Sequence, residues 1–454
     1  MGTSFRTGTM ARPGVLVIHN RYLEPGGEDS VVNAEVALLR SNGHRVLQYA
    51  RHNRELAQFS NMRKAILPLT TTWDYESYSE LRCLIRHERP AIAHCHNLLP
   101  LLSPAVYYAC AAEGIPLVQT AHNYRLVCPG GNFFHNNQRC DTCQGSLLRA
   151  TLRGCYRDSR MRTGVVTLML ATHRVLRTWQ KMVDTYIAPS EFCRALMTQH
   201  GLPANKIVAK PHFAPEIFPQ RDGLGDYAIF VGRLSEEKGI LQLLELWRGF
   251  ADIPLLVVGS GPLEQHARQV VQDSQLSNIS FTGSLPHHET LECIRKARFL
   301  VAPSRCYETF GMTVLEAMAC GVPSIVPRTG ALQELVCDGR TGFHVDVADR
   351  EQFSAVVRIM WSHALATQEM GRAARRRCIE HYSADSNYDK LIAIYEAALS
   401  RCERRHSYRV ENHALLPTHC REQTGASTGL QAGEQRGNQA AALAVALQDS
   451  QLQG

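Results

Sequence analysis

An alternation of short apolar runs with helical patterns, which occurs twice, constrains the fold of this chain more than any other feature. Residues 15–18 (VLVI) predict a buried strand, followed by a loop with Gly26 and Gly27 and then by a helical pattern. Further strand-like runs lie at 45–47, 91–93 and 116–118, with helical or loop material between them. Alternation of this kind predicts a doubly wound parallel sheet.

The alternation starts again in the second half of the chain. Strand-like runs lie at 227–231, 255–258, 279–281, 299–301 and 324–326. A segment rich in Pro, Gly and Asp, 211–225, has the composition of a linker between the two sets. We therefore expect an α/β protein of two domains, residues 14–219 and 220–384, after a flexible segment 1–13.

The C-terminal part of the chain is expected to contain one helix followed by a disordered tail. A helix over 385–402 is expected to cross back to the first domain. Residues 403–454 are rich in Gln, Ala, Gly and Ser and bury too little apolar surface to order themselves, so we expect a disordered tail.

The composition of the chain indicates where the protein resides more clearly than what it does. The longest apolar stretch, 165–171, is far shorter than the roughly 20 residues of a membrane span, and the first residues have no apolar core of signal-peptide length. An odd number of cysteines, 15, fits reduced thiols better than a disulfide framework. These features predict a cytoplasmic protein, whereas a net charge of +7 does not by itself identify a partner.

Two loops of the second domain have the composition of ligand loops. Arg233 and Lys238 follow the strand 227–231, at the edge where open α/β sheets bind ligands, and together they suit a diphosphate. Two solvated surface cations are the alternative. Gly259 and Gly261 follow the next strand and permit close approach of a ligand, although a plain turn explains them equally well.

The segment 303–323 carries the strongest signal. Glu308 lies in a loop, and Glu316 lies on a helix that begins near Gly311. The amide groups at the start of this helix can face a phosphate. Glu316 projects from an otherwise apolar helix, where a carboxylate needs partners such as ribose hydroxyls.

These residues resemble the retaining glycosyltransferases of family 4, whose signature is two glutamates separated by seven residues. The resemblance covers residues 15 to about 399 and implies a GT-B fold, in which two Rossmann-like domains face each other across a cleft. It implies that Arg233 and Lys238 bind the donor diphosphate, that Glu316 holds the ribose and that Glu308 orients the transferred sugar. The donor site implied by the family further includes Gly259, Gly261, Phe310, Gly311, Met312 and Thr313.

The first domain resembles the same family at two places. Gly26 and Gly27 form a loop expected near the diphosphate and the acceptor, and His122 is expected to hydrogen-bond the transferred sugar as a catalytic residue. His94 and His96 are two residues apart on a strand and would share one face, which suits either a metal site or a structural role. A structural role is the default interpretation.

The expected chemistry needs no catalytic metal. No Asp-x-Asp motif accompanies these loops, so Arg233, Lys238 and the helix dipole would stabilise the leaving group. The donor is expected to be a nucleotide diphosphate sugar. Family resemblance implies retention by a front-face route, in which the leaving phosphate helps to deprotonate the acceptor.

The segment 147–181 is basic and amphipathic, with eight Arg or Lys residues and one acid, Asp158. It resembles an interfacial region that touches anionic lipid, and a solvated helix face is the alternative. Membrane contact on the cytosolic face would make the acceptor a lipid-linked saccharide in polysaccharide assembly.

A sugar-nucleotide epimerase and a non-catalytic binding protein are the competing functions. A nucleic-acid partner is not expected, because no aromatic and basic platform is present.

Four cysteines in the first domain predict a structural zinc site. Cys128, Cys140, Cys143 and Cys155 have the spacing Cys-x11-Cys-x2-Cys-x11-Cys. The close central pair is typical of tetrahedral thiolate sites. Ordering the glycine-rich loop between the outer cysteines would cost much conformational entropy without a cross-link such as a metal ion. Thiols without a ligand are the alternative.

Overall fold

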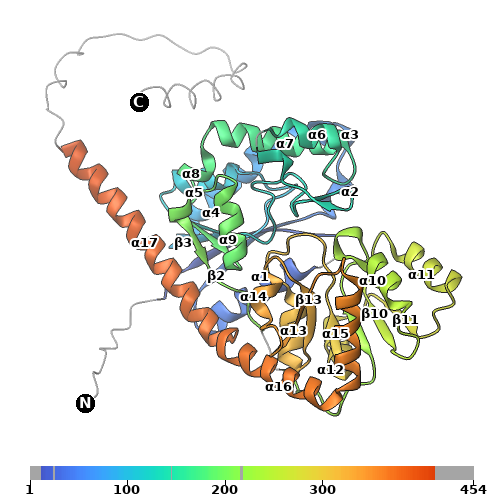
Figure 1. Cartoon of the computed structure of the whole chain (residues 1–454). Helices are drawn as coiled ribbons and strands as arrows, with labels where there is room; N and C mark the ends of the chain where they lie inside the picture. The colour runs from blue at the N-terminus through green and yellow to red at the C-terminus, as the bar shows by residue number, and fades with distance from the viewer. Residues whose placement is uncertain (1–11, 24–25, 145, 215–217, 415–454) are drawn as a thin grey trace, which may run out of the picture. The chain divides into compact units, whose positions relative to one another are not determined.

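The computed structural model describes residues 12–23, 26–144, 146–214 and 218–414. Most of the segment predicted to be flexible at the N-terminus, and residues 415–454 of the predicted tail, lie outside the described residues. Two parallel sheets of six strands each carry the α/β architecture. Figure 1 shows the helices that surround their strands. The expected α/β architecture with two parallel sheets is therefore observed.

The first sheet has the strand order β2-β1-β3-β4-β7-β8. Its strands are β1 Val15–Arg21, β2 Val46–His52, β3 Ile92–Cys95, β4 Leu117–Thr120, β7 Thr185–Ala188 and β8 Ile207–Ala209. Residues of β1 are buried almost throughout because helices cover both faces of the sheet. The sequence pattern predicts the first four strands and misses β7 and β8.

The second sheet has the order β11-β10-β9-β12-β13-β14. Its strands are β9 Ala228–Val231, β10 Leu255–Val258, β11 Ile279–Gly283, β12 Phe299–Val301, β13 Ser324–Pro327 and β14 Gly342–Val345. Five of these are predicted from the sequence, and β14 is not. A separate hairpin, β5 Phe134–His135 and β6 Gln138–Arg139, belongs to neither sheet.

Helices connect the strands of each sheet. In the first half they are α1 Gly27–Ser41, α2 Glu55–Gln58, α3 Asn61–Thr72, α4 Tyr75–Glu88, α5 Ala105–Ala112, α6 Leu148–Arg153, α7 Arg160–Val175, α8 Thr178–Lys181 and α9 Glu191–Gln199. In the second half they are α10 Ile240–Trp247, α11 Glu264–Asp273, α12 His287–Lys296, α13 Met312–Cys320, α14 Leu332–Leu335, α15 Arg350–Ser362, α16 Ala364–His381 and α17 Ala384–Ala414. Short 3-10 turns occupy η1 Thr142–Gln144, η2 Ala204–Lys206 and η3 Glu236–Lys238.

Helix α17 packs on the first sheet, although it follows the second sheet in sequence. Its residues Leu391, Ile394 and Tyr395 are buried in one cluster with apolar residues of β1, α1, β3 and β4. Asn387 donates its side-chain amide to the carbonyl oxygen of Pro211 at 2.6 Å. The helix continues to Ala414, past the end predicted at residue 402.

The strand orders place a switch point in each sheet. In the first sheet β1 lies between β2 and β3, and in the second β9 lies between β10 and β12. Loops that leave such strands at their carboxyl ends diverge and form a crevice, where open α/β sheets bind ligands. Along the described residues, no helix combines the length and the apolar character that crossing a bilayer requires.

Candidate functional site

A lysine and a glutamate meet at the switch point of the second sheet. Lys238, at the end of η3 after β9, places Nζ 2.6 Å from Oε1 of Glu308, in the segment after β12. Ser304 donates its hydroxyl to the same oxygen at 2.7 Å. Burial alone would raise the pKa of Glu308, but the Lys238 ammonium and these hydrogen bonds more than offset it, so the pKa lies below its ordinary value. The side chain is thus held as a carboxylate.

The other predicted cation lies at the start of the same loop. Arg233 is exposed, and it makes no side-chain hydrogen bond or ion pair with the residues that the structure describes. Its planar guanidinium is therefore free to bind an anion from solution.

The glycines of this region are explained by contacts between loops. A Cβ at Gly259 would lie 2.0 Å from the carbonyl oxygen of Gly232, and one at Gly261 would lie 2.5 Å from that of Leu234. The loops after β9 and β10 therefore touch backbone to backbone, which only glycine permits. This contact adds a third reason for glycine at these positions, beside the ligand approach and the plain turn considered from the sequence.

Glu316 lies on α13 with few partners. Its side chain is 16% exposed, and the nearest basic side-chain atom among the described residues is Nδ1 of His287 at 3.8 Å. Burial raises the pKa of this carboxyl to about 8. The expectation that this carboxylate needs partners from outside the protein agrees with this geometry.

The start of α13 lies next to the glycine loop of the first sheet. Gly311 caps the helix with φ +118°, and a Cβ there would lie 2.2 Å from a side-chain carbon of Leu332. A Cβ at Gly27 would lie 3.9 Å from Cγ of Met312, so the glycine loop, the amide of Met312 and that of Thr313 border one region. The ring of Phe310 is buried and packs against His212 at a centroid distance of 5.1 Å, so this side chain belongs to the core.

His122 is half-buried and forms a histidine stack with the buried residues His96 and His212. Its Nε2 lies 2.9 Å from Nδ1 of His96, and its ring stacks on those of His96 and His212 at 5.2 and 5.3 Å between centroids. Burial lowers the pKa of His122 well below its ordinary value, and nearby basic groups lower it further. The histidine is therefore neutral near pH 7, with one ring nitrogen already engaged.

Three hydrogen bonds tie the Glu308 segment to the first sheet. The Tyr124 hydroxyl donates to the carbonyl oxygen of Glu308 at 3.2 Å. Thr309 donates its hydroxyl to the carbonyl oxygen of His122 at 3.0 Å, and Ser190 donates its hydroxyl to that of Thr309 at 2.8 Å. No sequence signal singles out Tyr124, Thr309 or Ser190, because each acts through a contact between segments far apart in the chain.

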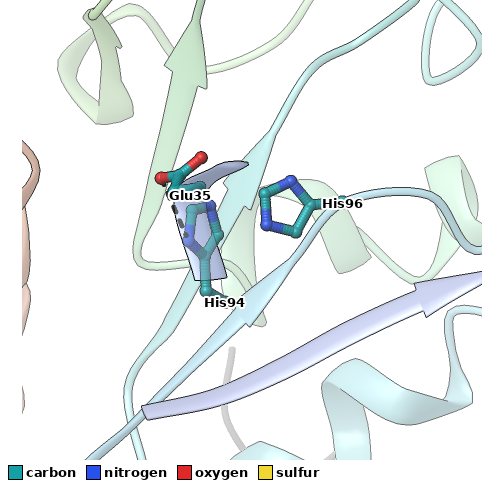
Figure 2. A group of neighbouring side chains, drawn as sticks. All are labelled: Glu35, His94 and His96. Carbon is teal, nitrogen blue, oxygen red and sulfur yellow. Dashed lines mark ion pairs between the residues drawn. The ribbon is translucent and has the colours of Figure 1, made fainter. Parts of the chain in front are cut away.

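One group of side chains has the spacing of metal ligands, Glu35, His94 and His96, drawn in Figure 2. Both ring nitrogens of His94 already have partners, the Tyr395 hydroxyl and the Thr120 hydroxyl, each at 2.7 Å. The buried ammonium of Lys210 lies 3.6 Å from Oε1 of Glu35 and would repel a cation. This geometry favours the structural role of the two histidines over the metal site.

The four cysteines of the predicted zinc site line one small cavity of about 10 Å³, together with residues such as Gly130 and Phe133. All four thiols are free. No three of their sulfur atoms lie within 4.8 Å of one another, and the Cys140 thiol contacts the Thr142 hydroxyl at 2.8 Å. The fold gathers these residues without forming a closed set of metal ligands.

The basic segment 147–181 is less uniformly amphipathic than its sequence suggests. Leu170 and Trp179 are buried in the core, whereas Leu148, Leu152 and Leu168 are exposed. Helix α3 packs beside α7 and adds further exposed apolar side chains. The resulting apolar-basic face comprises the exposed residues Met62, Ile66, Leu69, Leu148, Leu152, Met161, Leu168 and Val175 with Arg63, Lys64, Arg149, Arg153, Arg160 and Arg162.

Two family models match this chain in succession. The model described as Glycosyltransferase Family 4 matches residues 25–213, and the model described as Glycosyl transferases group 1 matches residues 219–377. The alpha-maltose-1-phosphate synthase of Mycolicibacterium smegmatis is 33% identical over 180 residues, which are 37% of this chain and 46% of that protein. The O-antigen chain mannosyltransferase C of Escherichia coli is 28% identical over 191 residues, or 41% of this chain and 51% of that protein. The chain thus spans about half the length of these curated relatives.

Solved structures agree in fold. The sucrose-phosphate synthase of Thermosynechococcus elongatus superposes with a TM-score of 0.65 at 17% identity, covering 86% of this chain and 100% of that chain. HepE of Anabaena, in complex with UDP and glucose, superposes with a TM-score of 0.60 at 14% identity, covering 84% and 99%. Because the two family models match residues 25–213 and 219–377 in sequence order, and the solved structures superpose over most of the chain, the chain belongs to family 4 of the glycosyltransferases and has the GT-B fold.

Proposed function

We propose that this protein transfers a sugar, with retention, from a nucleotide diphosphate sugar to a hydroxyl group of a saccharide acceptor. The observation that supports this function most strongly is the Lys238–Glu308 pair, with a contact of 2.6 Å at the switch point of the second sheet. Relatives named as mannosyltransferases, and the neighbour solved with UDP and glucose, point to the same donor class.

Arg233, Lys238 and the start of α13 bind the donor diphosphate in this proposal. The exposed guanidinium of Arg233 supplies a planar fork of donors, and Lys238 supplies a compact charge. The backbone amides of Met312 and Thr313, at the start of α13, add the positive end of a helix. These groups stabilise the negative charge that develops on the leaving diphosphate, so catalysis needs no divalent cation.

Glu316 accepts hydrogen bonds from the ribose hydroxyls. Its carboxyl is largely buried and lacks a close partner, and hydroxyl donors would compensate for that burial. Binding therefore favours the ionised form, which links nucleotide affinity to pH.

Glu308 and His122 orient the transferred sugar. Glu308 is fixed by Lys238 and Ser304 and keeps one oxygen, Oε2, for a sugar hydroxyl. Since His96 engages Nε2 of His122, Nδ1 is the ring nitrogen that would contact the sugar.

The chemical step follows a front-face route. The acceptor oxygen forms a bond to the anomeric carbon while the bond from that carbon to the diphosphate oxygen breaks on the same face. The acceptor proton moves to the leaving phosphate oxygen, so atoms and charge balance without a protein base.

The acceptor is a lipid-linked saccharide used in polysaccharide or glycolipid assembly, and the apolar-basic face rests on an anionic membrane surface, on its cytosolic side. Among the described residues, eight of the fifteen exposed large apolar side chains lie on α3, α6 and α7, beside arginines and a lysine that suit anionic headgroups. Flotation with anionic vesicles tests this contact: Met62→Ser with Leu69→Ser should reduce binding, whereas Leu365→Ser on α16 should not. Equal binding by both variants would remove this face from the proposal.

A thermal-shift screen with UDP, GDP, ADP and their sugars tests the donor class, because a ligand that binds the folded state raises its melting temperature. Product analysis with the donor that binds then separates the alternatives. A sugar-nucleotide epimerase converts the donor without an acceptor, a binding protein converts nothing, and the proposed transferase forms a new glycosidic bond with the original anomeric configuration.

A further inference from the structure

The loop 128–155 is held together by few regular elements. It contains the hairpin β5–β6, the turn η1 and the helix α6. Asn136 and Asn137 turn the hairpin with φ of 49° and 58°, and Phe133 before it has φ of 51°. A non-glycine residue held in this left-handed region is strained unless its surroundings fix it.

Backbone segments that are distant in sequence lie close together around the four cysteines. A Cβ at Gly130 would lie 3.2 Å from the carbonyl oxygen of Cys155, so a glycine lets the two ends of the loop meet. The amide of Cys140 donates to the carbonyl oxygen of Phe133 at 2.8 Å, which brings the central pair to the same place. Segments up to 27 residues apart, from Cys128 to Cys155, therefore converge on the small cavity that all four cysteines line.

We propose that Cys128, Cys140, Cys143 and Cys155 bind one structural zinc ion as thiolates. Zinc prefers a tetrahedral set of sulfur ligands at about 2.3 Å, which requires sulfur atoms about 4 Å apart. The cavity of about 10 Å³ at their centre is close to the space of one water molecule. Rotation of the Cys140 side chain away from Thr142 is one of the adjustments that closes the set.

The surrounding charges suit such a centre. Four thiolates and one Zn²⁺ carry a net charge of about −2. The guanidinium of Arg153 lies with Nη1 3.5 Å from the Cys140 sulfur, and its position at the end of α6 is fixed by a bond to the Thr142 hydroxyl at 2.8 Å. A cation beside a sulfur atom stabilises a negatively charged thiolate, whereas a neutral thiol gains no such charge attraction.

The ion would fix a loop that touches the Glu308 segment. Arg305 donates from Nη1 to the side-chain oxygen of Asn137 at 3.0 Å, and Arg139 donates from Nε to the carbonyl oxygen of Arg305 at 3.1 Å. The ring of Tyr307 lies 5.2 Å from the guanidinium of Arg139. The hairpin between the outer cysteines therefore contacts the residues that immediately precede Glu308, and a zinc staple would keep that contact in place.

Elemental mass spectrometry of the full chain, purified without a histidine tag, tests the site in the absence of any sugar donor. We expect about one zinc per chain, released when a mercurial reagent modifies the thiols, with a fall in melting temperature. Cys143→Ser and Cys155→Ser should lose the metal, whereas Cys293→Ser and Cys337→Ser, which change partly buried thiols near the second sheet, should keep it.

Two results would overturn the proposal. One is wild-type protein with far less than one zinc per chain after purification in zinc-containing medium, especially if its four thiols react in denaturant only after reduction, which would indicate disulfides instead. The other is zinc that remains bound in Cys143→Ser and Cys155→Ser. If these variants do not fold, the mercurial release from the wild-type protein decides the question alone.

Discussion

The loops of the two sheets meet at one region but are built in opposite ways. On the second sheet, Lys238 pairs with Glu308, and the only basic group within 4 Å of the Glu316 carboxyl among the described residues is the ring of His287. On the first sheet, His94, His96 and His122 are bonded and stacked among themselves and with the Tyr395 hydroxyl. Polar groups on the second sheet can still accept hydrogen bonds from a ligand, whereas those on the first sheet are already hydrogen-bonded within the protein.

This difference distinguishes side chains that bind a ligand from side chains that hold the backbone in place. A polar group without a partner costs free energy on burial, so it is retained where a ligand supplies the partner. A satisfied network instead fixes the backbone from which a few atoms reach the ligand. In the proposed function, the first sheet therefore mainly positions the segments around the sugar, and the second sheet binds the donor diphosphate and ribose.

The largest effect is expected at the diphosphate cations. Lys238→Ala and Arg233→Ala should each lower kcat/KM at least tenfold with the fold intact, because each removes a charge-assisted contact of about 1.5–3 kcal/mol. Steady-state kinetics measure this loss, and Lys296→Ala, which changes an exposed lysine at the end of α12, is the matched control. Wild-type turnover by both variants would show that the second sheet does not bind the donor as proposed.

The histidine stack should make stability depend on pH. Burial and nearby basic groups lower the pKa of His122 and His96, and lower that of His212 to about 3. The unfolded chain then binds more protons than the folded one, so stability is full above the unfolded pKa of about 6.5 and falls as pH drops below it. Melting temperatures measured from about pH 7 to about pH 5 should fall less steeply for His212→Phe, which keeps the stacked ring, than for the wild type.

A matched variant sharpens this prediction. His87→Phe changes a histidine whose side chain is 83% exposed, and it should leave the pH dependence as in the wild type. If His212→Phe and His87→Phe behave alike, the stack carries no protonation energy and the contrast between the two sheets weakens.

A smaller effect is expected at Glu316. Its pKa of about 8 means that the carboxyl ionises as pH rises through that value, and the ribose hydroxyls bind the ionised form better. Nucleotide affinity should therefore increase severalfold from about pH 7 to about pH 9 in the wild type, whereas Glu316→Gln should bind more weakly and with little change over that range. Calorimetric titration at several pH values measures this, and identical profiles would place Glu316 outside the nucleotide site.

The smallest effect is expected from metal removal. Brief treatment with EDTA should leave the initial rate unchanged, because Arg233 and Lys238 stabilise the leaving group instead of a divalent cation. Loss of activity that Mg²⁺ or Mn²⁺ restores would contradict this assignment.

The sequence predicts the second sheet better than the first. Its five apolar runs, such as 255–258, are continuous, and the motifs with Arg233 and Glu308 follow them directly. The missed strands are no shorter than predicted ones such as β12, but Thr185 in β7 and Gly342 and His344 in β14 interrupt their apolar runs. Strand β8 lies at the edge of its sheet with Val208 exposed, so only pairing with its neighbour identifies it as a strand.

The candidate site shows the same limit. Residue type and spacing single out Lys238 and Glu308, but not that the two side chains would pair, because that contact forms only when the strand order reverses between β9 and β12. Tyr124 and Ser190, which anchor the Glu308 segment, carry no pattern of their own. The glycines Gly259 and Gly261 are predicted as ligand or turn positions, and the contact between two loops that also requires glycine there has no signal in the sequence.

Titration of UDP, GDP and ADP into the full chain tests the central claim most directly, namely that the second sheet holds a nucleotide diphosphate through Lys238, Arg233 and Glu316. We expect at least one of the three to bind to the wild type and to Lys296→Ala with equal affinity, and to bind at least tenfold more weakly to Lys238→Ala. Absence of binding by all three nucleotides, or equal affinity in Lys238→Ala, would contradict the account.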